Sequence, residues 1–127
     1  MNCREQAIKI YETCVASART GSTLTYRELL DSLRYSAPAT GKAIRYGLEL
    51  ARIACAYSNL PPITSIVVNK LTGLPSAGYT PAKWASDTQE AFDKEFWPSV
   101  DDIDWEYVWK NRAVLSRKYG TTGYWTR

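Results

Sequence analysis

Few residues in this chain of 127 are suited to catalysis, because it contains no histidine. Thr64 and Ser65 offer adjacent hydroxyls, but no lysine or carboxylate stands beside them to act as a base. Asp101, Asp102 and Asp104 resemble cation ligands, yet they lack the glycine and the distant glutamate of an EF-hand loop. We therefore predict no catalytic residue and interpret the three aspartates as a solvated turn.

The three cysteines, Cys3, Cys14 and Cys55, show no CxxC spacing. Without histidine, a zinc site would need thiolates and carboxylates at spacings that the sequence does not contain. Cys14 and Cys55 sit among apolar residues of expected helices, which is typical of buried core thiols. We predict no metal and no cofactor.

Positively charged side chains offer more specific chemistry. One face of the helix expected at 41–57 carries charged residues at spacings of three and four: Lys42, Arg45, Glu49 and Arg52. Arginine can form two hydrogen bonds to a guanine edge, and arginine and lysine both neutralise phosphate. The alternative is a solvated face on which the glutamate pairs with its arginine neighbours.

Other residues extend this candidate surface. Tyr26 and Arg27 begin an expected helix, where backbone N–H groups favour a phosphate, although a cap and a half-buried tyrosine would look the same. Lys70 lies at an expected hairpin tip, which is either a wing or a polar turn. The predicted DNA-binding set is Tyr26, Arg27, Thr40, Lys42, Arg45, Glu49, Arg52 and Lys70.

The net charge of +3 is unevenly distributed along the chain. Residues 1–79 hold nine Lys or Arg against five acids, a net of +4. Residues 80–127 hold seven against eight, a net of −1, and all eight acids lie between Asp87 and Glu106. A basic first part followed by an acidic patch suggests two different surfaces.

Apolar spacing and capping signals predict a mainly helical chain. Thr25 with Glu28 three residues later forms a capping box, and Thr40 can cap the basic helix. The spacing of Gly47 and Ala51 permits close approach of another helix. The helices are expected at 4–19, 26–33, 41–57, 81–96 and 105–119.

Extended structure is expected in three short segments. Residues 22–25 can form a short strand, and the β-branched run at 63–69 predicts another. Residues 74–79 would return as its hairpin partner, at a sheet edge because of Pro75. The predicted fold class is therefore α+β and mainly helical: a winged helix-turn-helix over residues 1–79, with a helical extension over 80–127 in one compact unit.

Four short motifs carry a family resemblance. Residues 25–30 read Thr-Tyr-Arg-Glu-Leu-Leu and residues 37–44 read Ala-Pro-Ala-Thr-Gly-Lys-Ala-Ile; Asn-Leu-Pro-Pro at 59–62 and Val-Val-Asn at 67–69 follow. In this order they resemble the DNA-binding domain of alkylguanine-DNA alkyltransferases and of the catalytically dead alkyltransferase-like proteins. The resemblance covers about residues 5–79 and implies a DNA-binding winged helix.

This chain departs from the family pattern at the residues that carry out alkyl transfer. The resemblance aligns Ile-Thr-Ser-Ile at 63–66 with the Pro-Cys-His-Arg motif, so the reactive cysteine and its activating histidine are absent. Because a thiolate is the form that attacks an alkyl carbon, alkyl transfer is excluded. The arginine that replaces a flipped base matches Pro38, whereas the tyrosine that helps to push the nucleotide out matches Tyr26.

The sequence thus predicts a non-enzymatic DNA-binding protein. The helix at 41–57 would enter a groove and the hairpin at 63–79 would brace the backbone. Alanine at both Lys42 and Arg45 is expected to weaken binding by more than about tenfold. No apolar run reaches the roughly 18 residues of a membrane span, and no signal-peptide region is evident, so we expect a cytoplasmic protein without membrane contact.

An alternative is a small protein-binding inhibitor or adaptor, of phage or mobile-element type, acting on a host nuclease or defence system. All five tryptophans lie in 80–127 beside the acidic run, and aromatic residues with a charged rim are typical interface anchors. Tryptophans at helical spacing are more often core residues, so exposed tryptophans would favour the alternative. Its predicted interface comprises Trp97, Asp101, Asp102, Asp104, Trp105 and Trp109.

Overall fold

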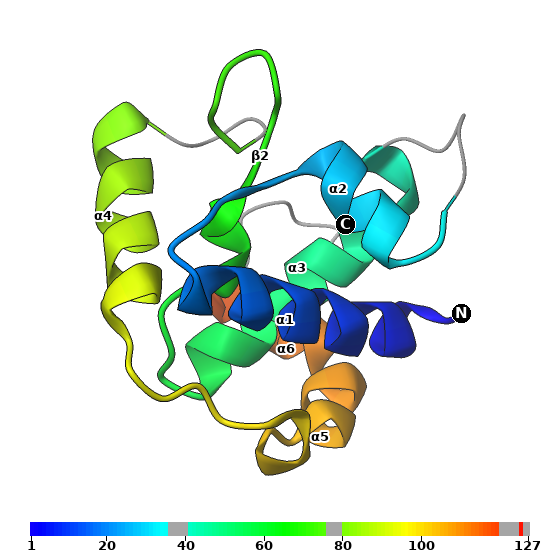
Figure 1. Cartoon of the computed structure of the whole chain (residues 1–127). Coiled ribbons are helices and arrows are strands. Elements are labelled where there is room, and N and C mark those ends of the chain that lie inside the picture. Colours follow the sequence, from blue (N-terminus) through cyan, green and yellow to red (C-terminus); the bar gives the residue numbers. More distant parts are fainter. Residues whose placement is uncertain (36–40, 76–79, 120–124, 126–127) are drawn as a thin grey trace.

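The computed structural model describes residues 1–35, 41–75, 80–119 and 125. Within them the chain is mainly helical, as predicted, with one two-stranded sheet (Figure 1). The α-helices are α1 Cys3–Arg19, α2 Tyr26–Ser32, α3 Arg45–Tyr57, α4 Pro81–Asp93, α5 Trp105–Lys110 and α6 Arg112–Tyr119. The strands are β1 Leu24–Thr25 and β2 Val67–Val68, and the short 3-10 helices are η1 Gly41–Ala43, η2 Ile63–Ile66 and η3 Val100–Asp102.

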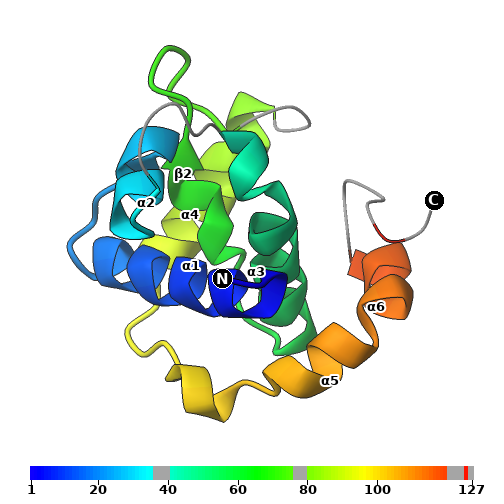
Figure 2. The ribbon, with the colours of Figure 1, turned by 90° about the vertical axis from the view of Figure 1, so that its right-hand side faces the viewer.

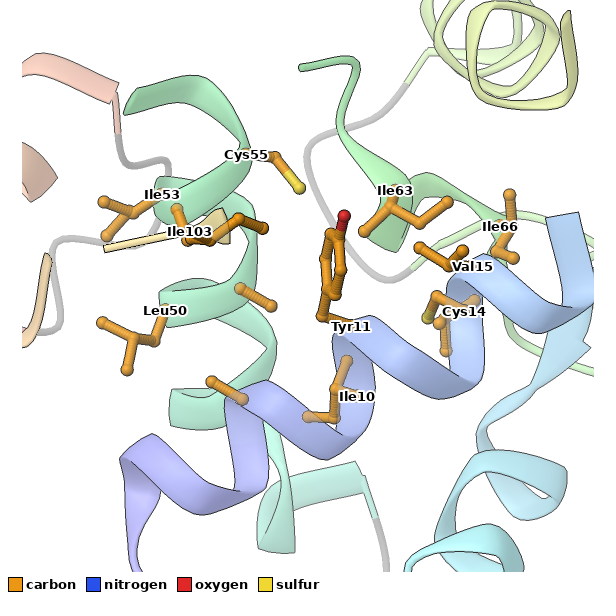
Figure 3. Close-up of a cluster of buried hydrophobic side chains, with 14 of the residues drawn as sticks. Ile10, Tyr11, Cys14, Val15, Leu50, Ile53, Cys55, Ile63, Ile66 and Ile103 are labelled. Carbon is orange, nitrogen blue, oxygen red and sulfur yellow. The ribbon is translucent and has the colours of Figure 1, made fainter. Parts of the chain in front are cut away.

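The hydrophobic core lies where α1, α3 and η2 meet (Figure 3). Tyr11 of α1 stands between side chains of α3 and η2, and its hydroxyl donates a hydrogen bond to the carbonyl oxygen of Pro98. All of the labelled side chains are buried: Ile10, Tyr11, Cys14, Val15, Leu50, Ile53, Cys55, Ile63, Ile66 and Ile103. The predicted core thiols Cys14 and Cys55 are therefore confirmed.

Capping residues fix the N-terminal starts of α1 and α2. Asn2 caps α1 by accepting a hydrogen bond from the Glu5 N–H at 2.8 Å. The predicted capping box of α2 is confirmed, because Thr25 accepts from the Glu28 N–H while the Glu28 carboxylate accepts from the Thr25 N–H. These caps satisfy backbone N–H groups that a helix start otherwise leaves without partners.

The antiparallel hairpin expected at 63–79 differs from what the structure describes. Residues 63–66 form a 3-10 helix, which buries Ile63 and Ile66 on one side, three residues apart. The short β2 pairs in parallel with β1, Leu24 opposite Val67. Tertiary burial here overrides the strand preference of β-branched residues. Most of the expected return strand, residues 76–79, lies outside the described residues, so the winged helix is not confirmed.

The C-terminal third folds over the other side of the core. The expected helix at 81–96 ends at Asp93, and the expected helix at 105–119 is divided at Asn111 into α5 and α6. Phe96 is 82% exposed, while the next residue, Trp97, is buried. Both α5 and α6 contact α3, and Figure 2 shows α1 and α6 on either side of it.

None of the helices in the described ranges combines the length and the hydrophobicity that crossing a bilayer requires.

Candidate nucleic-acid interface

Three segments that are distant in sequence lie at one end of the molecule. They are α2, the η1 turn that leads into α3, and the loop 69–74 that follows β2. Both η1 and β2 contact α2, and the upper part of Figures 1 and 2 shows all three segments at the same end. We call this region the basic end, because its exposed cations (Arg27, Lys42, Arg45 and Lys70) outnumber its exposed carboxylates (Glu28 and Asp31).

The start of α3 is the part of that helix that solvent can reach. Lys42 and Arg45 are exposed, and Tyr46 is 40% exposed. Ile44 occupies the N-cap position and has no side-chain acceptor for the first N–H groups. A helix start with two exposed cations beside it suits a phosphate group. Thr40, the predicted cap, lies outside the described residues.

Aromatic rings lie beside these cations. The Arg45 guanidinium carbon stands 5.1 Å from the centroid of the Tyr46 ring, within the range of a cation–π contact. The Tyr46 ring in turn meets Trp125, with the two centroids 5.9 Å apart. Tyr46 is not among the predicted DNA-binding residues, although its place beside Arg45 in a predicted surface helix is a usable signal.

A glutamine from α1 fixes the position of this helix start. The Gln6 side-chain amide donates to the Ala43 carbonyl oxygen at 3.0 Å and to the Tyr35 hydroxyl at 2.9 Å. Its side chain lies over Gly47, where an added Cβ would come within 2.3 Å of the Gln6 Oε1 atom. The close approach predicted from the Gly47 spacing is therefore confirmed, and α1 holds η1 in place.

The prediction of one continuous charged face along α3 was wrong. Glu49 is 4% exposed and Arg52 is only partly exposed. Ile53, which lies on the same side as Glu49, is completely buried. The physical reason is that α5 and α6 pack against α3 in addition to α1, so the middle of α3 is enclosed and only its first turn can reach a groove.

Arg27 has a structural role within α2. Its Nε pairs with the Asp31 carboxylate at 3.1 Å, and its Nη2 donates to the Tyr35 carbonyl oxygen at 3.0 Å. Tyr26 is half-buried against the core. These contacts favour the structural interpretation of both residues over direct phosphate binding.

Lys70 is exposed in a hydrogen-bonded loop. The Asn69 N–H donates to the Leu74 carbonyl oxygen, and the Gly73 N–H donates to the Asn69 carbonyl oxygen, each at 2.8 Å. Because Lys70 lies between these cross-loop bonds, its backbone is well fixed while its ammonium group faces water. The predicted position of a cation at a turn tip is confirmed.

The opposite, lower part of Figure 1 holds η3 and α5, which we call the acidic end. Asp101, Asp102 and Asp104 are exposed there, and Asp104 caps α5 by accepting from the Tyr107 N–H at 3.0 Å. Glu106 pairs with Lys110 at 2.9 Å, and this hydrogen bond and charge hold the pKa of its carboxyl below the ordinary value.

The tryptophans of the acidic end point inward. Trp97 and Trp105 are 5% and 6% exposed, and both rings pack edge-on against Tyr11. Trp109 is partly buried beneath the Arg112 guanidinium, whose carbon lies 3.9 Å from the ring centroid. The prediction that Trp97 and Trp105 anchor a protein partner is therefore contradicted by their burial, because they form core contacts instead.

The described residues support neither a hydroxyl nucleophile nor a metal site. Ser65 is 1% exposed and its hydroxyl accepts a hydrogen bond from Thr88 at 3.4 Å. No group of three or more Cys, Asp or Glu residues stands close enough to hold a metal ion in the described part of the chain. Burial raises the pKa of the Cys55 thiol to about 12 and raises that of Cys14 further, so both are poor nucleophiles.

Comparison with known proteins gives no match: no family model, no curated protein and no solved structure is significantly similar to this chain. The resemblance to alkyltransferases therefore stays a prediction from short motifs.

Proposed function

We propose that this chain is a non-enzymatic protein that binds duplex DNA through its basic end. The observation that carries the proposal is the separation of charge. Lys42, Arg45 and Lys70, from segments distant in sequence, are exposed at one end, while the carboxylates of η3 and α5 lie at the other. Such a distribution orients a protein toward a polyanion before contact.

The geometry supports a specific docking mode. The η1 turn and the first turn of α3 offer Lys42 and Arg45 to the phosphates beside a groove, while the loop 69–74 reaches the neighbouring backbone. The middle of α3 stays within the protein, so the contact is limited to the helix start. First-turn contacts are how recognition helices of helix-turn-helix proteins reach base edges.

The test is fluorescence anisotropy of a labelled duplex titrated with the chain over a series of salt concentrations. The affinity should fall steeply with salt, because bound cations release counterions from the phosphates. Lys42→Ala/Arg45→Ala should lose on the order of tenfold or more in affinity, and its log–log salt slope should be shallower by about two.

The matched control is Lys9→Ala/Lys110→Ala, which removes the same charge from exposed residues away from the basic end. Equal losses in the two double variants would show that net charge alone attracts DNA. Unchanged binding in the basic-end variant would end the proposal.

Protein binding at the acidic end is the second candidate. Phe96 is 82% exposed, and the rings of Tyr57 and Tyr107, both partly exposed, stack at 5.0 Å. An inhibitor or adaptor role would use these rings with the surrounding carboxylates rather than the buried tryptophans. The test is the affinity of the chain for a purified partner protein. This role would be favoured if Phe96→Ala and Tyr107→Ala lower that affinity while Lys42→Ala/Arg45→Ala leaves it unchanged.

The proposal also includes a cytoplasmic location. All three cysteines are free, and two of them are fully buried. Free thiols without disulfides are usual in a reducing compartment. Attachment of a fluorescent protein and imaging in the cells of origin would test this directly.

A further inference from the structure

The loop 69–74 presents an apolar side chain at its tip. Leu71 is 94% exposed, more than any other large apolar residue in the described ranges. Single exposed apolar residues are common on protein surfaces, so exposure alone carries no inference. The rigidity of the loop, its projection from the molecule and the cations around it distinguish this leucine.

Hydrogen bonds hold the loop in one conformation. Asn69 closes it by bonding to Leu74 and Gly73 through its backbone, each at 2.8 Å, and its side-chain oxygen accepts from the Leu71 N–H at 2.8 Å. The Thr72 hydroxyl accepts from the Leu74 N–H at 3.2 Å. Gly73 has a φ of +71°, a conformation that favours glycine. Little order must be gained when such a preorganised tip binds.

The loop is also anchored at its base and projects outward. Val67 and Val68 of β2 are 1% and 5% exposed, and they pair with β1. In Figures 1 and 2 the loop extends beyond the helices at the basic end. A surface that docks on this end therefore meets the loop tip early, before it reaches the body of the protein.

The chemistry around the tip indicates the kind of partner. Lys70 precedes Leu71 and is exposed, and Lys42 and Arg45 lie at the same end. An apolar tip beside an exposed lysine, on an end that carries further cations, is complementary to a partner with an anionic outside and an apolar inside. Duplex DNA has this arrangement, with phosphates outside and stacked bases within.

We propose that Leu71 inserts between adjacent base pairs of duplex DNA and bends the duplex. This inference rests on the proposed function and adds a residue and a mode of binding to it. Architectural proteins insert apolar wedges from the minor groove, which partly unstacks one base step and kinks the duplex by about 20–90°. Lys70 beside the wedge, with Lys42 and Arg45 elsewhere on the basic end, can then contact phosphates that the bend brings closer.

The experiment uses the full chain and a short duplex with a fluorophore pair on its ends and 2-aminopurine at a central step. Binding of the unmodified chain should shorten the end-to-end distance and raise the 2-aminopurine fluorescence as that base unstacks. Leu71→Ala should abolish both signals and lose roughly tenfold in affinity, with the salt slope unchanged. Leu71→Phe should retain bending.

Val114→Ala is the matched control, because Val114 is an exposed apolar residue on α6 at 60% exposure. It should bind and bend as the unmodified chain does. Since both positions are exposed, neither alanine variant should change the thermal unfolding temperature measurably.

The outcomes separate the wedge from the proposed function. Salt-dependent binding with no bending, or bending that persists in Leu71→Ala, would overturn the wedge while DNA binding stands. Absence of any DNA binding by the unmodified chain would overturn both.

Discussion

The two ends of the molecule use charged and aromatic residues in opposite ways. At the acidic end, the Trp97 and Trp105 rings fill the interior around Tyr11, and the carboxylates remain at the surface with Tyr107. At the basic end, cations and one aromatic ring are at the surface, on backbone fixed by Gln6 and by the loop hydrogen bonds. The tryptophan-rich third of the chain therefore serves mainly to complete the core, whereas a small number of cations mark the candidate interface.

A second difference lies within α3. Its first turn is exposed and cationic, whereas the middle of the helix is buried on nearly every side. Most of α3 therefore serves to pack the core and not to bind a partner. Its rigidity helps the interface, because a fully packed helix holds its first turn in a fixed position.

The acidic end should be the more sensitive region for stability. Trp105 is 6% exposed, donates from Nε1 to the Val100 carbonyl oxygen at 3.1 Å and packs on Tyr11. Trp105→Ala should reduce the free energy of unfolding by about 3–5 kcal/mol, measured by urea denaturation. Phe96→Ala, at an exposed aromatic, should change it by less than about 0.5 kcal/mol. Equal losses would contradict the division between core and surface rings.

The α1–α3 contact behind the basic end should be the next most sensitive. Gly47→Ala places a Cβ against the Gln6 side chain and should cost about 1–3 kcal/mol of stability. Gln6→Ala/Gly47→Ala should be more stable than the sum of the single changes predicts, because the second substitution removes the clash. Strict additivity in this double-mutant cycle would contradict the contact.

Alkaline pH should weaken the core between the two ends. Burial raises the pKa of both Cys14 and Cys55 above the ordinary thiol value of 9.0, so the folded chain keeps protons that the unfolded chain loses. Stability should therefore be constant below about pH 8 and fall progressively from about pH 9 upward, toward the Cys55 pKa of about 12. Urea denaturation at several pH values measures this.

Cys55→Ala should make that decline shallower, because one of the two protonation differences is removed. If the free energy of unfolding fell just as steeply with pH in the variant, other groups would cause the alkaline effect. Tyr11 is one such group, because burial also raises its pKa.

The smallest effect is expected from the carboxylates. Asp101→Asn/Asp102→Asn should change DNA affinity by less than about twofold at physiological salt, because charges beyond a Debye length are screened. The same anisotropy titration checks this prediction. A gain of tenfold or more would mean that the acidic end competes with DNA for the basic end.

Sequence patterns predicted what depends on local physics. The capping box at Thr25, the core thiols and the close approach at Gly47 follow from neighbouring residues or helical spacing, and all are confirmed. The helices lie in the expected regions, but α3 begins at Arg45 after a 3-10 turn, α4 ends at Asp93, and the last helix is divided at Asn111. The burial of Glu49 and the 3-10 helix at Ile63–Ile66 depend on which distant segments pack there. One local signal was available, because an isoleucine at position 53 on the supposedly charged side of α3 indicated a second packed face.

The exposed leucine of the loop 69–74 was not singled out from the sequence, although it follows Lys70 at the expected turn tip. Its 94% exposure and the hydrogen bonds that fix the loop come from the structure.

The most direct test of the central claim is a map of backbone amide chemical shifts as a duplex is added to the isotope-labelled chain. The account predicts that shifts concentrate at 41–46 and 69–74, and that residues of η3 and α5 keep their positions. Shifts concentrated at Asp101–Glu106 with none at the basic end would contradict it.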